Sequence, residues 1–323
     1  MAKQGHPPGL YVLFFTEMWE RFSYYGMRAL LVLYLTAEVA RNGFGLVRDN
    51  ALEIYAVFTG LVYLTPIIGG ILADKVLGQR KAIFIGAVTM ALGQFSLAGS
   101  VMFDDPVMRQ NFLYYGLAIL ILGNGFFKPN ISTIVGGLYA DGDTRKDSAF
   151  TIFYMGINLG AFFSPLVCGT LGEKFGWEYG FGMAGIGMLI GTIWFYVQGH
   201  KLGDVGYAPK NTDEVKSYSS KDWMDVILYI VGSAALCLAF VLFWFKIPED
   251  IQNYITIGLA IVGTIGLLSV IIKGTSGSTE WSRVGVIIVL AVFNVVFWSG
   301  FEQAGGTFNL FAAENTDRML LGW

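Results

Sequence analysis

The sequence predicts an all-α polytopic membrane protein, and three observations lead to this fold class. Of the 323 residues, 54% are hydrophobic and only 14% are charged, and the mean hydropathy is +0.57. A soluble domain of this size does not bury so much apolar surface. Uncharged runs of about 20 residues, the length that crosses a bilayer as a helix, recur along the whole chain. Because lipid cannot satisfy free backbone groups, these runs must be helical.

About nine membrane crossings are predicted in this way, on the ~20-residue criterion. Six are uncharged runs: Ile54–Ala73, Ala82–Phe103, Ser148–Gly172, Tyr179–Gly199, Val226–Phe245 and Ile251–Ile272. Three more contain isolated charged residues: Tyr11–Ala37, Asn111–Ala140 and Val284–Ala313. Many of the runs contain glycine, which indicates close packing between helices.

The longest polar stretch, His200–Asp225, lies between the sixth and seventh crossings and predicts a boundary after a six-helix bundle. If the N-terminus is cytoplasmic, the inner loops carry 12 Lys and Arg residues and the outer loops carry 6. The excess of positive charge inside favours this orientation.

Several functional classes are disfavoured by composition. The net charge of -3 shows no basic excess, which argues against a nucleic-acid partner. Cys168 and Cys237 both lie in apolar runs and predict neither a disulfide framework nor a metal site. No phosphate-binding loop and no nucleophile–base or metal constellation occurs at membrane depth. We therefore expect neither an enzyme nor a bound cofactor.

The first predicted helix carries four charged residues, each of which costs at least ~2.5 kcal/mol in hydrocarbon. At ~3.6 residues per turn they fall, with two tyrosines, within an arc of about 140°, and the other face is apolar. This arc comprises Glu17, Glu20, Arg21, Tyr24, Tyr25 and Arg28. The charges could neutralise each other and only brace the bundle. Alternatively, they could form a proton-sensitive network with cationic capacity for a substrate carboxylate.

The ten residues from Glu17 to Gly26 resemble the ExxERFxYYG signature of the proton-dependent oligopeptide transporter (POT) family at every fixed position. This family is part of the major facilitator superfamily. The resemblance implies an N-terminal six-helix bundle (residues 1–200), a cytoplasmic linker with an additional two-helix hairpin (201–281) and the first helix of an incomplete C-terminal bundle (282–323). Such transporters use paired repeats with the site between them, so most of a second half needed for function would be missing.

Lys128 lies well inside the fourth crossing and is followed by Pro129, which tends to kink a helix. A lysine at this depth needs an anion, unless it snorkels to the membrane interface. The family resemblance implies a pair between Lys128 and Glu17 or Glu20.

The fifth crossing contains Phe153-Tyr154-Met-Gly-Ile-Asn158-Leu-Gly160, similar to the second family signature, FYxxINxG. Asn158 could simply join two helices by a hydrogen bond. The resemblance instead implies that Asn158 and Tyr154 bind the peptide, and that Tyr63 on the second crossing lines the same pocket, although Tyr63 could also be an ordinary packing residue.

The segment Phe297-Trp298-Ser-Gly-Phe301-Glu302 resembles the seventh-helix segment of the family, in which a Trp and a buried acid line the cavity. Trp298 and Glu302 are four residues apart and would share one helix face. An ionised carboxylate in this apolar run would be costly, which suits a proton carrier. A permanently protonated Glu302 that only bonds a neighbouring helix is the alternative.

Together the resemblance implies a proton-coupled symporter of di- and tripeptides in the cell (inner) membrane, working by alternating access. Glu17, Glu20, Lys128 and Glu302 would couple protons. The substrate would contact Arg21, Arg28, Tyr24, Tyr25, Tyr63, Lys128, Tyr154, Asn158 and Trp298. Alternatives are transport of another anionic solute, such as nitrate or a conjugated metabolite, and a peptide receptor that does not transport.

Overall fold

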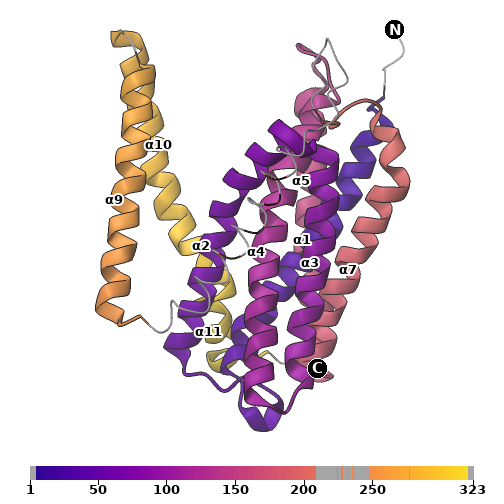
Figure 1. The fold of residues 1–323 in the computed structure, drawn as a ribbon, viewed down its shortest axis with the longest axis vertical. Helices are drawn as coiled ribbons and strands as arrows, with labels where there is room; N and C mark the ends of the chain where they lie inside the picture. The colour runs from indigo at the N-terminus through magenta and orange to yellow at the C-terminus, as the bar shows by residue number, and fades with distance from the viewer. Residues whose placement is uncertain are drawn as a thin grey trace. The chain divides into compact units, whose positions relative to one another are not determined.

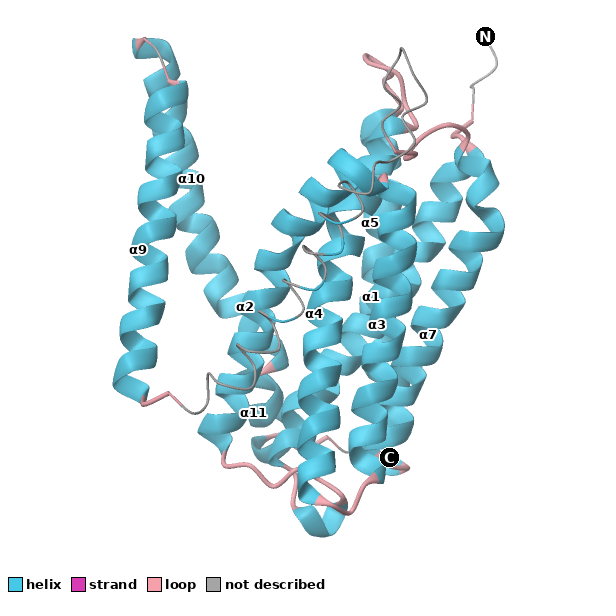
Figure 2. Ribbon diagram, viewed as in Figure 1, coloured by secondary structure: helices cyan, strands magenta, loops and turns pink. Residues whose placement is uncertain are grey.

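The computed structural model describes residues 5–208, the single positions 224, 227, 231 and 235, and residues 247–275 and 277–318. The chain divides into two compact units, Met1–Leu238 and Ala239–Trp323. Figure 1 shows the helices in chain order, and Figure 2 shows that the described residues form helices and loops without a strand. The predicted all-α class is confirmed.

The first unit is a bundle of six long helices. They are α1 (Pro8–Thr36), α2 (Arg48–Leu72), α3 (Gln79–Met102), α4 (Pro106–Gly137), α5 (Lys146–Ser164) and α7 (Trp177–Gln198). A π-helical turn, Ala73–Leu77, extends α2, and a second one, Pro165–Gly169, joins α5 to the short α6 (Thr170–Lys174). These helices occupy the six crossings predicted for this part of the chain, with small shifts at their ends.

Among the described residues, six helical segments are apolar and long enough to cross a membrane, five of them in the first unit. The exception there is α1, whose 29 residues would span about 43 Å but include four charges. It packs against α5 on one side and α7 on another, while α3 packs against both α4 and α7, and α2 against α4. The charges of α1 are therefore enclosed by protein and do not face lipid.

The start of α1 and the start of α3 lie at the same end of the first unit. Arg80, in the first turn of α3, donates through Nε to the carbonyl oxygen of Val205 at 2.6 Å and through Nη2 to that of Gly203 at 2.5 Å. Gly9, in the first turn of α1, packs beside Leu202 of the same segment. Hence α1 and α3 run in the same direction.

The second unit contains α9 (Glu249–Gly274), α10 (Ser278–Phe301) and α11 (Thr307–Asn315). The prediction of one continuous crossing over Val284–Ala313 is wrong, because α10 ends at Phe301 and a 3-10 turn, Glu302–Gly305, follows. Two consecutive glycines, Gly305 and Gly306, explain the interruption, since each costs about 1 kcal/mol in a helix relative to alanine.

Some predictions fall on parts of the chain that the structure does not describe. These are most of the crossing Val226–Phe245, with Cys237, and the polar residues 209–223. The proposed boundaries between residues 1–200, 201–281 and 282–323 stay predictions.

Candidate functional site

Arg21 is the centre of a buried ion-pair cluster on α1. Its Nε lies 2.9 Å from Glu17 Oε1 and 2.5 Å from Glu20 Oε2, and all three side chains are at most 4% exposed. The contact with Glu17 spans one helical turn, the i, i+4 spacing that favours ion pairs. Two carboxylates around one guanidinium place excess negative charge in the interior of the bundle, a costly arrangement unless other cations or protons offset it.

Tyrosines of α1 and α2 surround the two arginines of α1. Arg28 donates through Nε to the hydroxyl oxygen of Tyr55 at 2.6 Å, and its Cζ lies 5.6 Å from the centre of the same ring. The Cζ of Arg21 lies 5.5 Å from the ring centre of Tyr24 and 6.0 Å from that of Tyr25. Cations are attracted to the electron-rich faces of such rings. The tyrosines therefore fix the position of both guanidinium groups.

Lys128 of α4 approaches the same cluster. Its Nζ lies 4.8 Å from the ring centre of Tyr63 on α2. Its positive charge acts on the Glu20 carboxyl, together with the charge of Arg21. Three helices thus contribute to one charged region, α1 with acids and arginines, α4 with the lysine and α2 with tyrosines. A direct ion pair of Lys128 with Glu17 or Glu20 stays a prediction.

Helix α5 packs closely against the part of α1 that carries the cluster. A Cβ atom at Gly160 would overlap the carbonyl oxygen of Met18 and would lie 2.9 Å from the Cβ of Arg21, so only glycine fits. The two predicted ligands on α5 are exposed. Tyr154 is 63% exposed, and Asn158 is exposed and donates through Nδ2 to the carbonyl oxygen of Tyr154 at 2.9 Å. Their approach to the charged cluster stays a prediction.

Trp298 and Glu302 belong to the second unit. Trp298 lies near the end of α10, with its ring centre 5.1 Å from that of Phe301. Glu302 begins the 3-10 turn that follows α10, so it is not inside a continuous helix as predicted. Their approach to the cluster of the first unit stays a prediction.

Three further polar residues of the region were not predicted from the sequence. Tyr55 binds Arg28, Gln94 donates through Nε2 to Ser23 Oγ at 3.1 Å, and Asn124 is 1% exposed. Gln94 and Asn124 could have been found, because a polar side chain within an apolar crossing is costly and needs a reason. Tyr55 gives no such signal, since tyrosine is common near the ends of membrane helices.

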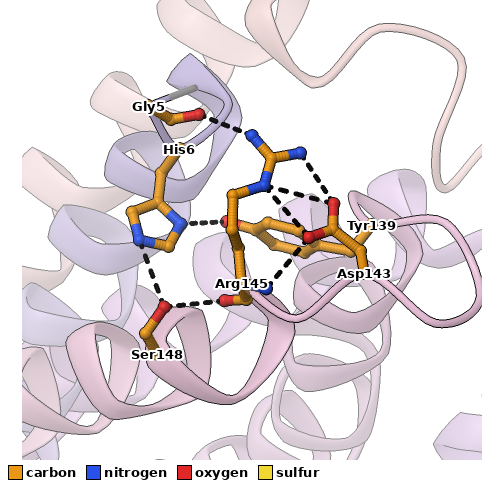
Figure 3. A network of polar contacts seen from close by, with 6 residues as sticks. All are labelled: Gly5, His6, Tyr139, Asp143, Arg145 and Ser148. Carbon is orange, nitrogen blue, oxygen red and sulfur yellow. Dashed lines mark hydrogen bonds and ion pairs between the residues drawn. The ribbon is translucent and has the colours of Figure 1, made fainter. Parts of the chain in front are cut away.

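A second polar network lies at the end of the bundle where α1 begins (Figure 3). Arg145, in the loop before α5, donates three side-chain hydrogen bonds to Asp143, from Nη2 to Oδ2 at 2.6 Å and from Nε to Oδ1 at 3.0 Å and to Oδ2 at 3.2 Å. It also donates through Nη1 to the carbonyl oxygen of Gly5 at 2.8 Å. The hydrogen bonds from Arg145 lower the pKa of Asp143 to about 2. This carboxylate is therefore ionised at every physiological pH.

His6 extends this network towards α4 and α5. Its Nδ1 lies 2.8 Å from the hydroxyl oxygen of Tyr139, just after α4, and its Nε2 lies 3.4 Å from Ser148 Oγ on α5. Burial is the main cause that raises the pKa of Tyr139, so its hydroxyl is protonated and can donate to His6. The contacts tie the start of the chain to the loop between α4 and α5.

Among the residues that the structure describes, no group of three or more His, Cys, Asp or Glu side chains could hold a metal ion. The predicted absence of a metal or other cofactor from the mechanism stays a prediction.

Comparison with known proteins identifies similar sequences. The model of the PTR2 family, described as the POT family, matches residues 80–322. The chain is 37% identical to the peptide transporter YePEPT of Yersinia enterocolitica over 99% of its own length and 62% of the relative. It is also 37% identical to a di-/tripeptide transporter of Lactococcus lactis subsp. cremoris, over 93% of its own length and 60% of the relative.

Solved structures give the same result for the fold. A peptide transporter POT in complex with sulfate superposes with a TM-score of 0.81 at 36% identity, covering 100% of this chain and 64% of the other. A POT family transporter in complex with 5-aminolevulinic acid also gives 0.81, at 34% identity, covering 100% of this chain and 65% of the other. The predicted major facilitator fold is confirmed.

The chain thus spans somewhat less than two thirds of the length of these relatives, 62% for the Yersinia protein. Within that length the signature on α1 forms a buried charged cluster, and the family model covers most of the chain. The chain belongs to the POT family of membrane transporters.

Proposed function

We propose that the protein is a proton-coupled symporter of di- and tripeptides. The observation that carries this proposal is the buried cluster in which Arg21 binds both Glu17 and Glu20, with Lys128 in electrostatic range. The two acids contact Arg21 directly, and Lys128 acts on Glu20 at longer range. A proton on either acid would release positive charge of Arg21 or Lys128 for a substrate carboxylate. The relatives named as peptide transporters support the choice of substrate.

The proposed mechanism is alternating access. A proton that binds Glu17 or Glu20 weakens the hold of the acids on Arg21 and Lys128. These cations then bind the carboxylate of a peptide, for which a guanidinium offers paired hydrogen bonds. Arg28 helps to hold the same carboxylate, and Tyr24, Tyr25 and Tyr63 shape the pocket around it. Loss of the proton on the other side restores the ion pairs and releases the peptide.

The opposite wall of the pocket comes, in this proposal, from Trp298 and Glu302 and from the part of the relatives' length that this chain does not span. Tyr154 and Asn158, exposed on α5, contact the peptide backbone when the second half of the transporter is present. Glu302 is a further proton carrier. The protein acts without a cofactor and without catalysis.

We also propose that the protein lies in the cell membrane with a cytoplasmic N-terminus. The end of the first unit where α1 begins carries Arg80, Arg145 and Lys201, among other basic residues. Basic residues concentrate on the cytoplasmic side of membrane proteins.

The test is uptake of labelled di- and tripeptides by proteoliposomes that contain the full-length protein. An inward proton gradient should drive accumulation above the external concentration, and a protonophore should abolish it. Binding without accumulation would indicate a receptor. Accumulation of nitrate but not of peptides would assign the protein to another branch of the family.

A further inference from the structure

Asn124 of α4 is a buried amide that has no hydrogen-bonding partner among the described residues. It is 1% exposed, and neither Oδ1 nor Nδ2 forms a hydrogen bond with any residue that the structure describes. Leaving a buried polar group unpaired costs about 1–3 kcal/mol. Asn130, also on α4 and 2% exposed, avoids this cost because its Nδ2 donates to the carbonyl oxygen of Phe126 at 2.7 Å. Asn124 therefore offers both an acceptor and a donor to a neighbouring group whose own hydrogen bonds change.

The neighbours of Asn124 on α4 define the direction of its side chain. A Cβ at Gly123 would lie 2.6 Å from Met90 Cγ of α3, and one at Gly125 would lie 2.8 Å from Thr65 Cβ of α2. Successive residues of a helix point roughly 100° apart. The side chain of Asn124 thus points between α2 and α3, into the interior of the bundle, where α1 packs against α4.

The hydrogen bonds of α3 place Asn124 in the same layer as Glu20. Gln94 of α3 donates to Ser23 of α1, so these two residues are level with each other. Because α1 and α3 run in the same direction, Glu20 and Met90, each about one turn earlier, are also level. Met90 packs against the residue that precedes Asn124. Glu20 is fully buried in this layer, and its Oε1 forms no hydrogen bond with the described residues.

The charged groups that act on Glu20 come from two helices. They are Arg21 and Glu17 of its own helix and Lys128 of α4, one turn after Asn124 on the same face. On α2 the nearby titratable groups are Tyr55 and Tyr63, which lie against Arg28 and Lys128. The charged residues of α3, α5 and α7 all lie in their first turns: Arg80, Lys81, Lys146, Asp147 and Glu178.

Hydrogen-bond chemistry distinguishes the two protonation states of Glu20. A carboxylate only accepts hydrogen bonds, so it can use the amide nitrogen of an asparagine but leaves the amide oxygen unpaired. A protonated carboxyl donates through its O–H and accepts through its C=O, which matches the acceptor and donor of a primary amide. Either orientation of the Asn124 amide offers this pair.

We propose that Asn124 is the hydrogen-bond partner of the protonated Glu20 side chain, and that it positions this proton carrier during coupling. The inference rests on the proposed proton-coupled function. Arg21 and Lys128 stabilise the charged form of Glu20, and Asn124 stabilises the neutral form. Each protonation state then has its own partners on α1 and α4, so the carboxyl group changes partners when it gains or loses a proton.

The test compares Asn124→Leu with the matched control Asn130→Leu in the full-length protein. Leucine has a similar volume to asparagine and no hydrogen-bonding group. We expect the midpoint of the pH dependence of gradient-driven peptide uptake to move to lower pH by about one unit in Asn124→Leu, a tenfold lower proton affinity. Peptide exchange at saturating acidity should be retained. Asn130→Leu should keep the wild-type midpoint.

An unchanged midpoint in Asn124→Leu would overturn the proposal, as would an equal shift in both variants. These results leave the transport function intact, because the wild-type protein still accumulates peptide. If the wild-type protein shows no gradient-driven uptake, the proposed function itself has failed.

A second measurement does not require an Asn124 variant to fold. The infrared difference spectrum between acidic and neutral pH contains the C=O stretch of protonated Glu20, which is assigned by its loss in Glu20→Gln. A frequency lowered by strong hydrogen bonding supports the inference. The frequency of an isolated carboxylic acid in apolar surroundings contradicts it.

Discussion

The first unit contains two polar networks built on the same chemistry, and they differ in burial. In the α1 cluster, Arg21 contacts two carboxylates, and the side chains are at most 4% exposed. At the loop end of the bundle, Arg145 contacts the single carboxylate of Asp143, and the side chains are 31% and 17% exposed. Water reaches the second pair and weakens its electrostatic interaction, whereas the first pair lies among apolar helices.

The hydrogen bonds of the two networks differ as well. The loop network pairs its groups with main-chain and side-chain partners from three segments, including the carbonyl oxygen of Gly5. In the buried cluster, Glu17 Oε2 and Arg21 Nη2 form no hydrogen bond with any described residue. Incomplete pairing in a low-dielectric site is costly, and such a site responds strongly to a proton or an anion. We propose that the loop network is structural and that the buried cluster takes part in transport.

Removal of Arg21 should have the largest effect on uptake and stability. Arg21→Ala leaves Glu17 and Glu20 buried without their shared cation, and breaking a buried pair in this way costs about 3–5 kcal/mol. We expect peptide uptake to be lost and the melting temperature of the purified protein to fall. Arg145→Ala is the matched control, and it should retain uptake and most of the thermal stability. Equal losses in the two variants would contradict the distinction between the networks.

Glu20→Gln should distinguish proton coupling from peptide binding. The glutamine keeps the shape of the side chain but cannot exchange a proton. We expect accumulation against a concentration gradient to stop, while exchange of peptide across the membrane continues. Counterflow and gradient-driven uptake are measured on the same proteoliposomes. A variant that still accumulates peptide would show that Glu20 is not a coupling group.

Lys128→Ala tests whether the lysine on α4 contributes to peptide binding at the cluster. Hydrogen bonds to charged groups contribute about 1.5–3 kcal/mol, which corresponds to a loss of roughly 10- to 100-fold in peptide affinity. Peptide binding is measured by displacement of a labelled dipeptide. A peptide analogue with an amidated C-terminus should bind wild type and variant equally, because it lacks the carboxylate that Lys128 would contact. A full loss of affinity for the amidated analogue as well would indicate a folding defect.

The sequence was sufficient to predict the helical class, the six crossings of the first unit and the polar arc of α1. These features follow from local patterns, since charge within an apolar run and a helical repeat are visible residue by residue. The pairing of Arg28 with Tyr55 was not predictable in this way, because it depends on how α1 and α2 pack. The end of α10 at Phe301 was not predicted, because the apolar run continues through Gly305 and Gly306 and its length alone suggests one long helix.

Tyr55→Phe should have a smaller effect than the changes above. It removes the hydroxyl that accepts the hydrogen bond from Arg28 Nε but keeps the ring against the guanidinium. A net loss of about 1 kcal/mol predicts roughly fivefold weaker peptide binding. The pH midpoint of uptake should be unchanged, since Tyr55 contacts Arg28, which is not among the charged groups that act on Glu20. A changed midpoint would place Tyr55 among the coupling groups.

Asp143→Asn should have the smallest effect on uptake of these substitutions. Because Arg145 lowers the pKa of Asp143 to about 2, the folded protein binds this proton less readily than an unfolded chain, in which an aspartate has a pKa of about 3.9. The stabilisation from this pair is complete above the unfolded value and is lost as the pH falls through about 2.

No part of this titration falls between about pH 5 and pH 8, the range in which histidine changes charge. Uptake by Asp143→Asn should therefore follow the wild-type pH profile, with a rate within about twofold, because water reaches this ion pair and weakens it. The measurement is the same proteoliposome assay across that range. An altered profile would mean that the loop between α4 and α5 takes part in coupling, and the two networks would then have to be treated as one.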